Sequence, residues 1–477
     1  MKLRAAWLLL LLAPLVAGRV VPAQDRPLVF ADITVIDATG SPARPHRMVT
    51  VSGKKIAQIE EYRRGGEPKT ADAIDGRGKF LIPGLWDMHV HWYDERFLPL
   101  FLANGVTGVR QMWGMPMHQQ WRRRMQEGSL VGPREFIASA IIDGPKPVWP
   151  RSVGVKDAAE AEAAVRTSRK NGADFIKVYS LLPRDAYFAI AAESKREGLP
   201  FAGHVTFAVS LSEASDAGQK SVEHLTGVLL AASSREDQFR KELVEAMSAA
   251  SPFSATGAIN QRRAKELRES YDPVKAAALY RRLARNRTWQ TPTLTVLRAM
   301  ANLDDPRFID DPRLKYVAPS VRQTWDPHAD FRLKQRTKED WNQARLTYDL
   351  YVKVVGEMRR EGVQFLAGTD VLNPFCFPGF SLHDELALLN GAGLTPMEAI
   401  QAATRGAADY LGILDSFGTV EKGKTADLVV LDANPLDDIH NTQKIAGVMI
   451  GGRYLPKASL EKMLGDVEAV ARLSERR

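Results

Sequence analysis

The sequence predicts an α/β fold: a (β/α)8 barrel of the TIM type, with a small β-sandwich domain built from both ends of the chain. Three observations support this class. Between residues 81 and 410, eight short apolar segments alternate with longer helical patterns, which is typical of parallel strands joined by crossover helices. Residues 24–80 and 411–477 contain segments rich in β-branched residues between turn residues. Polar residues that can bind metals recur at the ends of the barrel segments.

Residues 1–23 have the pattern of a secretory signal peptide. Lys2 and Arg4 precede an apolar run that reaches Val16, and small residues follow up to Ala23. The run is shorter than the roughly 20 residues that a membrane span needs, although an uncleaved anchor is the alternative. We therefore expect export to the periplasm or the extracellular space, without stable membrane insertion after cleavage.

Charge and cysteine content narrow the classes of partner and of metal site. The net charge is +8 over 477 residues, so the basic run 121–124 indicates a solvated helix face and no nucleic-acid partner. The single cysteine, Cys376, excludes an intrachain disulfide and a cysteine-based metal site. Any metal must be bound by histidine, carboxylate or a modified lysine. A homo-oligomer is compatible with this composition.

The order of elements follows from the apolar runs. The eight barrel strands are expected within residues 81–91, 106–113, 136–143, 174–180, 199–206, 221–227, 287–296 and 363–371. Helical patterns such as residues 157–173 lie between them. The stretch from about 297 to 360 is too long for an ordinary strand-to-helix connection. We interpret it as a helical insertion whose position suits a lid, and expect a C-terminal helix after the last strands of the small domain.

His89 and His91 stand one residue apart at the end of the first barrel strand. Alternate side chains of a strand face the same side, so both imidazoles would point into the barrel mouth while Val90 faces the helices. Two imidazoles on one side suit a single metal ion. An H-x-H pair alone also occurs by chance.

Four more polar residues end later strand candidates: Lys177, His204, His224 and Asp370. Each has an ordinary explanation, such as a buried lysine that reaches a carboxylate, a core imidazole or a helix-capping aspartate. Their recurrence at successive strand ends favours a catalytic set, because catalytic groups gather at the carboxyl ends of barrel strands.

These segments resemble the amidohydrolase superfamily, and within it the imidazolonepropionase-like and Xaa-Pro dipeptidase-like (prolidase-like) metal-dependent hydrolases. The resemblance rests on "PGLWDMHVHW", "IKVY", "GHV", "VEHL", "GTD", "ELALLNGAGLTPMEAIQAAT" and "GTVEKGKTADLVVLD", which follow one another in this order. It covers nearly all of the chain after residue 23.

The resemblance implies a centre of two divalent metal ions. His89 and His91 would bind the more buried ion with Asp370; His204 and His224 would bind the second; Lys177, carboxylated at N6, would bridge the two. Zinc fits such a nitrogen and oxygen ligand set, with manganese or cobalt as alternatives. Asp370 would also be the catalytic acid–base, which takes a proton from an activated water and passes it to the leaving amine.

Two residues are further candidates for substrate contacts. Tyr179 shares a strand face with Lys177 and either donates to an oxyanion or packs the barrel wall. His383 follows the last strand and either contacts substrate or has a structural role at a helix start.

The predicted function is hydrolysis of a linear amide or peptide bond, in a dipeptide such as Xaa-Pro or in an N-acyl amino acid. A mononuclear cyclic-amide hydrolase or deaminase of the same fold is one alternative, which a bridging Lys177 disfavours. A non-catalytic binding protein with a decayed site is another, which the complete ligand set disfavours.

Overall fold

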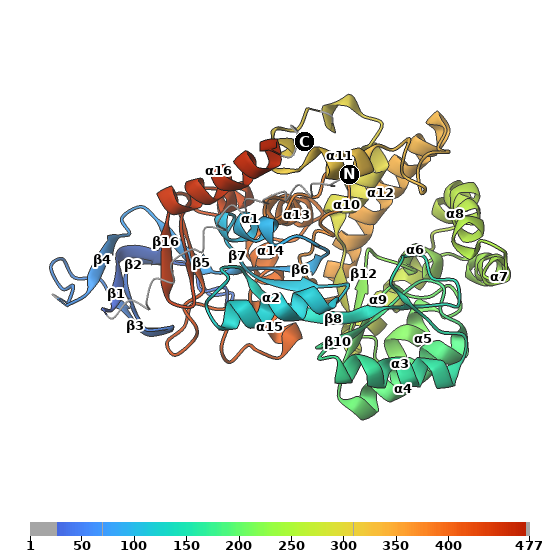
Figure 1. The fold of residues 1–477 in the computed structure, drawn as a ribbon, viewed down its shortest axis with the longest axis horizontal. Coiled ribbons are helices and arrows are strands. Elements are labelled where there is room, and N and C mark those ends of the chain that lie inside the picture. The colour runs from blue at the N-terminus through green and yellow to red at the C-terminus, as the bar shows by residue number, and fades with distance from the viewer. Residues whose placement is uncertain (1–25, 69, 309, 474–477) are drawn as a thin grey trace, which may run out of the picture.

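The computed structural model describes residues 26–68, 70–308 and 310–473, so the predicted signal peptide lies outside the described residues. Figure 1 shows the barrel in the centre and the small domain at one side, where blue N-terminal and red C-terminal strands lie next to each other. Within the described ranges, no helix combines the length and the apolar character needed to cross a membrane.

The small domain is one continuous sheet that both chain ends share. Its strands are β1 (Leu28–Val35), β2 (Arg44–Ser52), β3 (Lys55–Glu61), β4 (Asp72–Asp75), β5 (Phe80–Pro83), β14 (Leu428–Leu431), β15 (Ile445–Ile450) and β16 (Arg453–Pro456). They pair in the order β16-β15-β14-β5-β1-β2-β3, with β4 on β1. Antiparallel pairing of β14 with β5 brings Val429 opposite Ile82. Alternate residues of these strands are buried in an apolar cluster around Phe30, Val49 and Leu428.

The barrel strands are parallel and buried. They are β6 (Leu85–Val90), β7 (Val106–Gln111), β8 (Arg134–Asp143), β10 (Phe175–Val178), β11 (Phe201–Gly203), β12 (Ser221–Glu223) and β13 (Trp289–Thr291), and the short β9 (Val153–Gly154) pairs with β8. Every residue of β6 and β10 is buried. Such strands read as continuous apolar runs because helices cover their outer face and barrel side chains their inner face.

Residues 363–371 close the barrel at the eighth position without forming a regular strand. Single bridges join Phe365 to β13 and Val371 to β6. The amide of Asp370 donates to the carbonyl of His89 at 2.8 Å. A Cβ at Gly368 would lie 2.7 Å from the Cβ of His89, so only glycine allows this approach. The barrel and the small β domain from both chain ends are confirmed. The small domain is one continuous sheet and not the expected sandwich of two sheets, because β5 pairs with both β1 and β14 and so joins the strands of the two chain ends. The eighth strand is irregular where it carries Asp370.

Most helices surround the barrel and connect its strands, while η5 (Ile439–Gln443) and α16 (Lys457–Leu473) belong to the C-terminal part of the chain. The others outside the insertion are η1 (Glu95–Phe97), α1 (Leu98–Ala103), α2 (Pro116–Gln126), α3 (Ala158–Lys170), α4 (Arg184–Glu197), α5 (Leu211–Asp216), α6 (Val228–Ala231), α7 (Glu236–Ala246), α8 (Pro252–Glu269), α9 (Pro273–Arg285), α10 (Leu294–Asn302), α13 (Phe380–Gly391), α14 (Pro396–Ala402) and α15 (Arg405–Leu411). The predicted helix within 157–173 is α3, and it begins where the side chain of Asp157 accepts from the amide of Glu160 at 2.9 Å.

The long stretch before the eighth position is helical, as its sequence indicates. After α10 it contains η2 (Pro306–Phe308), η3 (Pro312–Tyr316), α11 (Pro319–Arg322), η4 (Gln323–Trp325) and α12 (Lys338–Arg360). α11, η4 and the turns between η4 and α12 contribute the residues of the insertion that reach the barrel mouth.

Candidate metal centre and active site

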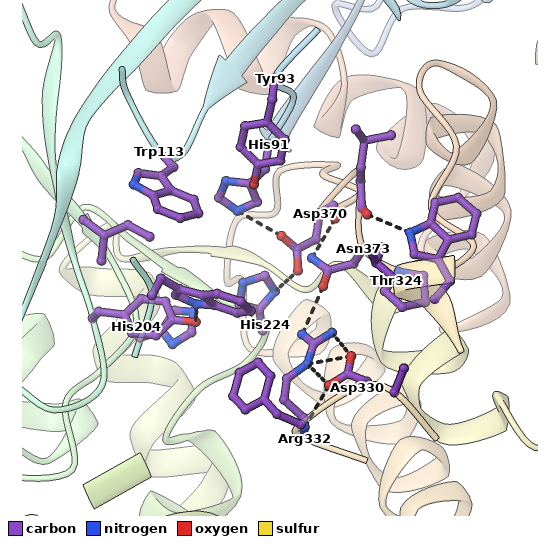
Figure 2. A pocket seen from close by; sticks show the side chains of 18 of the residues that line it. His91, Tyr93, Trp113, His204, His224, Thr324, Asp330, Arg332, Asp370 and Asn373 are labelled. Carbon is purple, nitrogen blue, oxygen red and sulfur yellow. Dashed lines mark hydrogen bonds and ion pairs between the residues drawn. The ribbon is translucent and has the colours of Figure 1, made fainter. Parts of the chain in front are cut away.

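A cavity of about 600 Å³ opens at the carboxyl ends of the barrel strands. Strand ends supply five of its polar residues: His91, Lys177, His204, His224 and Asp370. The insertion supplies the facing wall, which includes Trp325, Asp330, Phe331 and Arg332. Figure 2 shows the histidines and Asp370 on one side and Arg332 with Asp330 on the other. A cavity of this size accommodates a small molecule or a dipeptide.

Three residues at the strand ends adopt a left-handed backbone. The φ angles are 57° at His224, 49° at Thr293 and 60° at Asp370. A side chain in this region costs on the order of 1 kcal/mol or more, and such residues concentrate at functional sites. The turns aim His224 and Asp370 at the cavity instead of continuing the strands.

His89, His91 and Asp370 present three ligand atoms around one point. The Nε2 atoms of the two histidines lie 3.2 Å apart, and they lie 3.3 and 3.1 Å from Oδ1 of Asp370. The centre of such a triangle is about 1.9 Å from each atom, close to the Zn–N and Zn–O bond lengths of about 2.0–2.2 Å. The donor set therefore fits one divalent ion just above the plane of the triangle.

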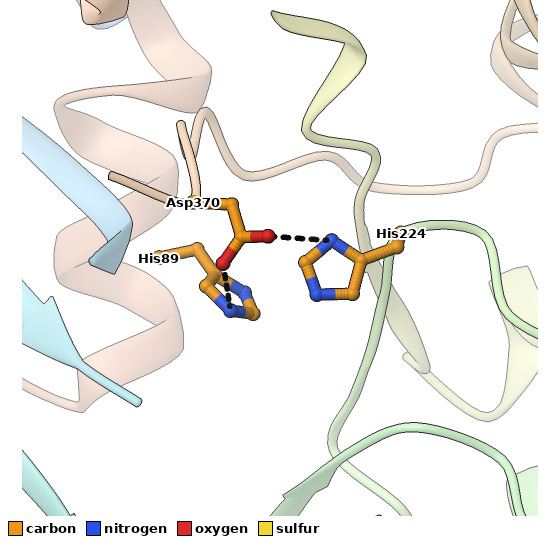
Figure 3. A group of neighbouring side chains, drawn as sticks. All are labelled: His89, His224 and Asp370. Carbon is orange, nitrogen blue, oxygen red and sulfur yellow. Dashed lines mark ion pairs between the residues drawn. The ribbon is translucent and has the colours of Figure 1, made fainter. Parts of the chain in front are cut away.

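His224 belongs to the same cluster. Its Nδ1 lies 3.9 Å from Oδ2 of Asp370, and ligand atoms of His89, His224 and Asp370 all lie within 4.8 Å of one another (Figure 3). The hydroxyl of Thr293, 2.7 Å from Nδ1, orients the ring. The two oxygens of Asp370 thus face different imidazoles, an arrangement that could connect two ions.

His204 adjoins this cluster. Its ring centroid lies 5.0 Å from that of His224, and its Nδ1 is 2.9 Å from the hydroxyl of Ser180. Burial, followed by the positive charge of Lys177, lowers the pKa of His204 well below its ordinary value. A neutral imidazole is the form that binds metals.

Lys177 is 1% exposed and lines the cavity beside His204 and His224. Glycine at position 203 leaves room for its stem, because a Cβ there would lie 3.1 Å from Cδ of the lysine. Burial lowers the pKa of Lys177 to about 8. An ammonium group among imidazoles is electrostatically unfavourable, whereas an anionic derivative of this lysine would fit a metal cluster.

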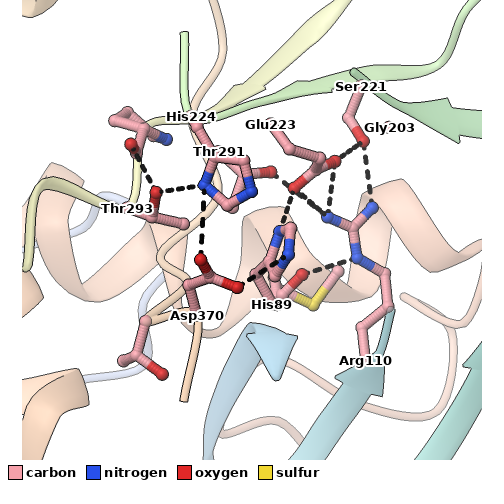
Figure 4. Close-up of polar contacts among 12 residues, drawn as sticks. His89, Arg110, Gly203, Ser221, Glu223, His224, Thr291, Thr293 and Asp370 are labelled. Atoms are coloured by element: carbon pink, nitrogen blue, oxygen red, sulfur yellow. Dashed lines mark hydrogen bonds and ion pairs between the residues drawn. The ribbon is translucent and has the colours of Figure 1, made fainter. Parts of the chain in front are cut away.

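Glu223 and Arg110 form a buried network beneath the histidines, and neither has a role in the sequence-based interpretation (Figure 4). Oε2 of Glu223 lies 2.7 Å from Nδ1 of His89. Arg110 donates from Nη2 to both oxygens of Glu223 at 2.9 Å, and both side chains are 0% exposed. A carboxylate behind a metal-binding histidine fixes its tautomer, which leaves Nε2 for the ion. The sequence contains one signal for Glu223: it is a carboxylate directly before His224 in an apolar strand. An unpaired charge is costly there, so a buried partner is expected.

Tyr179 lines the cavity and His383 does not. Trp149 Nε1 donates to the Tyr179 hydroxyl at 2.8 Å, and the tyrosine ring stacks on His204 at 3.9 Å between centroids. His383 is buried in α13, where its ring nitrogens lie 3.0 Å from the hydroxyl of Thr442 and 3.0 Å from the carbonyl of Asn104. Both nitrogens have partners there, so the structural alternative accounts for His383.

Four aromatic side chains, which we call the aromatic wall, lie along one side of the cavity: Tyr93, Trp113, Trp149 and Phe331. Successive ring centroids lie 6.1, 6.3 and 5.6 Å apart. They come from four separate segments of the chain, and no local sequence pattern indicates that these rings meet.

The comparisons with known proteins agree with this geometry. Residues 352–455 match the model of the amidohydrolase family. An ochratoxinase of Aspergillus niger is 33% identical over 122 residues, and this match spans 24% of the chain and only 24% of that protein. Among solved structures, a bottromycin amidohydrolase has a TM-score of 0.73 and 25% identity, over 94% of this chain and 91% of that one. A Xaa-Pro dipeptidase with bound methionine has a TM-score of 0.64 and 21% identity, over 90% of this chain and 100% of that one.

Proposed function

We propose, on the premise that this chain belongs to the amidohydrolase superfamily, that it is an exported, binuclear metal-dependent hydrolase that cleaves a linear amide or peptide bond. The substrates we infer are dipeptides such as Xaa-Pro and N-acyl amino acids. The observation that carries the proposal is the triangle of His89, His91 and Asp370 at the floor of the cavity. The names of the similar proteins, a dipeptidase, an amidohydrolase and an ochratoxinase, support it.

The chemistry divides between the ions and the chain. Two divalent ions, for which zinc suits the ligands, would supply a water activated at neutral pH and an electrophile for the scissile carbonyl. Asp370 would hold that water, accept its proton and deliver the proton to the leaving amine as the C–N bond breaks. His204 and His224 would complete the second ion's ligands, with N6-carboxylated Lys177 as the bridge. The Tyr179 hydroxyl stands on the wall where it could donate to the carbonyl oxygen.

The bridging role of Lys177 has a direct test. We expect Lys177→Ala to lose most activity and to regain part of it with acetate and excess zinc, because a small acid can occupy the vacated space between the ions. Lys177→Arg should show no rescue, since its guanidinium keeps the positive charge and fills the site. Amide hydrolysis by both variants, with and without acetate, is the measurement. An active arginine variant that ignores acetate would contradict the bridge.

Metal analysis separates the alternatives. We expect about two ions per chain in fully active protein, the number in two-metal sites of this kind. One ion at full activity would favour a mononuclear cyclic-amide hydrolase or deaminase. A protein that binds no metal under any loading condition would favour a non-catalytic binding protein.

Export is a proposal that rests on residues 1–23 alone. Expression of the full chain in a bacterium, followed by intact-mass measurement of the periplasmic fraction, tests it. A mature N-terminus near Gln24 is expected, and retention of the full chain in the cytoplasm would contradict export.

A further inference from the structure

Arg332 places a guanidinium group in the wall of the cavity, facing the metal centre (Figure 2). Its side chain is 22% exposed. Nη1 donates to Oδ1 of Asn373 at 3.1 Å. The side-chain amide of Asn373 in turn donates to the carbonyl of Asp370 at 3.0 Å. The Arg332 guanidinium is therefore linked through Asn373 to the turn that carries Asp370. These bonds define its position relative to the candidate metal centre.

The bonds of Arg332 leave part of its donor capacity free. Asp330 accepts from Nε at 3.0 Å and from Nη2 at 2.6 Å, and the guanidinium carbon lies 5.6 Å from the ring centre of Trp149. With Asn373, the described partners use Nε–H and one hydrogen on each terminal nitrogen. A guanidinium has five N–H groups, so one further hydrogen on each terminal nitrogen remains for a ligand. Nη1 and Nη2 can therefore each donate one further hydrogen bond to a carboxylate oxygen.

Local turn formation does not account for this placement. Arg307 has the same relation to Asp305, with bonds from its backbone amide and Nε to Oδ1 at 3.0 Å, but its side chain is 87% exposed and does not line the cavity. Burial, the bond to Asn373 and the position opposite the histidines distinguish Arg332. The two arginines therefore form a matched pair for experiment.

The aromatic wall lies directly beside this cation. Trp149 contacts both Phe331 and the Arg332 guanidinium, and its indole nitrogen holds Tyr179. Phe331 is 50% exposed and Tyr93 is 46% exposed, so apolar ring surface is available where the cavity opens. A ligand that carries an anionic group and an apolar group on the same carbon atom could use both features at once.

We propose that Arg332 binds the free carboxylate of the substrate's amino-acid part, while the aromatic wall receives the side chain of that residue. The preferred substrates are then N-acyl amino acids and dipeptides whose released residue is large, apolar and uncapped at its carboxyl group. The inference rests on the proposed function, which leaves open the residue type and how it is recognised. Asp330 and Asn373 act as positioning residues for the guanidinium.

The test uses the zinc-loaded full chain with N-acetyl-L-phenylalanine, N-acetyl-L-phenylalaninamide and N-acetylglycine. Amine release gives kcat/KM, and ligand-induced shifts in Tm report binding without turnover. We expect the wild-type protein to favour N-acetyl-L-phenylalanine over its amide about 10–100-fold, the usual worth of hydrogen bonds to a charged group. It should also favour it over N-acetylglycine. Arg332→Gln should abolish the preference for the free acid, Arg332→Lys should keep a minor part of it, and Arg307→Gln should leave it unchanged.

The outcomes separate this inference from the proposed function. Equal hydrolysis of acid and amide by wild-type protein would overturn the carboxylate site while leaving the hydrolase intact. A preference that survives in a folded Arg332→Gln variant would also overturn it, because the metal ions would then recognise the carboxylate. Binding of N-acetyl-L-phenylalanine that depends on Arg332, without hydrolysis of any amide, would uphold the site and contradict the hydrolase. If the wild-type protein neither binds nor hydrolyses N-acetyl-L-phenylalanine, the inference is overturned.

Discussion

Asp370 and Glu223 approach the same histidine from opposite sides. Asp370 Oδ1 lies 3.3 Å from Nε2 of His89, and Glu223 Oε2 lies 2.7 Å from its Nδ1. Asp370 lines the cavity, on the side of His89 where we propose the ion. Glu223 is enclosed with Arg110 in the barrel interior. The roles we propose for the two carboxylates are therefore separable: Asp370 in proton transfer, and Glu223 in holding His89.

Asp370→Asn should retain the fold and most of the metal but lose turnover. The amide keeps the shape of the side chain but cannot accept and return a proton at neutral pH. General acid–base groups contribute roughly 10²–10⁴-fold, so a loss of at least that size in kcat is expected. The measurement combines kcat with zinc content. Near-normal kcat in a zinc-loaded variant would show that another group transfers the proton.

Glu223→Gln should weaken metal binding about 10–100-fold, the usual effect of removing a carboxylate behind a metal-binding histidine. The measurement is a competition titration of the zinc-loaded protein with a chelator, which does not depend on activity. Glu193→Gln is the matched control, because Glu193 is 3% exposed and its ion-pair partners in the described part of the chain are Arg166 and Arg196, with no imidazole among them. Equal zinc affinity in the two variants would refute a positioning role for Glu223.

At the scale of elements, the contact between β6 and the eighth segment assembles the centre. Asp87 accepts from the amide of Thr369 at 3.1 Å and from its hydroxyl at 2.6 Å. These two residues flank His89 and Asp370 in their motifs, and burial raises the pKa of Asp87 to about 7. The pairing holds two candidate ligands, His89 and Asp370, in place although 281 positions of sequence separate them (370 minus 89).

Gly368→Ala tests this contact. The added Cβ would lie 2.6 Å from Cγ2 of Thr291 and 2.7 Å from Cβ of His89, so β6 or the segment must shift. We expect a loss of about 1–3 kcal/mol in the free energy of unfolding, typical of overpacking, and a parallel loss of zinc affinity. Gly391→Ala, where no atom lies within 4 Å, should show neither effect. Chemical denaturation and zinc titration of both variants are the measurements.

At the scale of the whole molecule, the amino end of β8 joins the barrel to the small domain. Arg134 donates from Nε to Asp427 at 2.7 Å, and Asp427 also accepts from the amide of Gly451 at 2.6 Å. Glu135, the next residue, is 6% exposed, and neither of its oxygens has a hydrogen-bond partner among the described residues. Burial raises the pKa of Glu135 from 4.5 to about 8.

The stability of the whole protein should therefore depend on pH through Glu135. The protonated acid suits the buried site, so its contribution is fully present below about pH 4.5 and is lost as the pH rises through about 8. Relative to wild type, Glu135→Gln should gain stability progressively across that window, by on the order of a few kcal/mol above it. Urea denaturation of both proteins from pH 4.5 to 9 measures the difference. A difference that does not change with pH would contradict a buried, protonated Glu135.

The sequence by itself determined the barrel, the β domain shared by both chain ends, and the placement of six candidate ligands at strand ends. The reason is local: apolar runs of strand length alternate with helical periodicity, and a period of two puts His89 and His91 on one side. The structure then brings His89, His91 and Asp370 within 3.3 Å of one another and places Lys177 in the same cavity as His204 and His224.

Only the tertiary structure decided which residues surround that centre. Glu223 pairs with His89 across 134 positions, and the aromatic wall combines four segments. Arg332 reaches Asn373 from a turn of the insertion between η4 and α12. The eighth segment pairs with its neighbours through single bridges, and at Gly368 it lies so close to β6 that only glycine fits. Such contacts depend on the relative placement of elements distant in sequence, whereas residue periodicity reports only which face of its own element a side chain occupies.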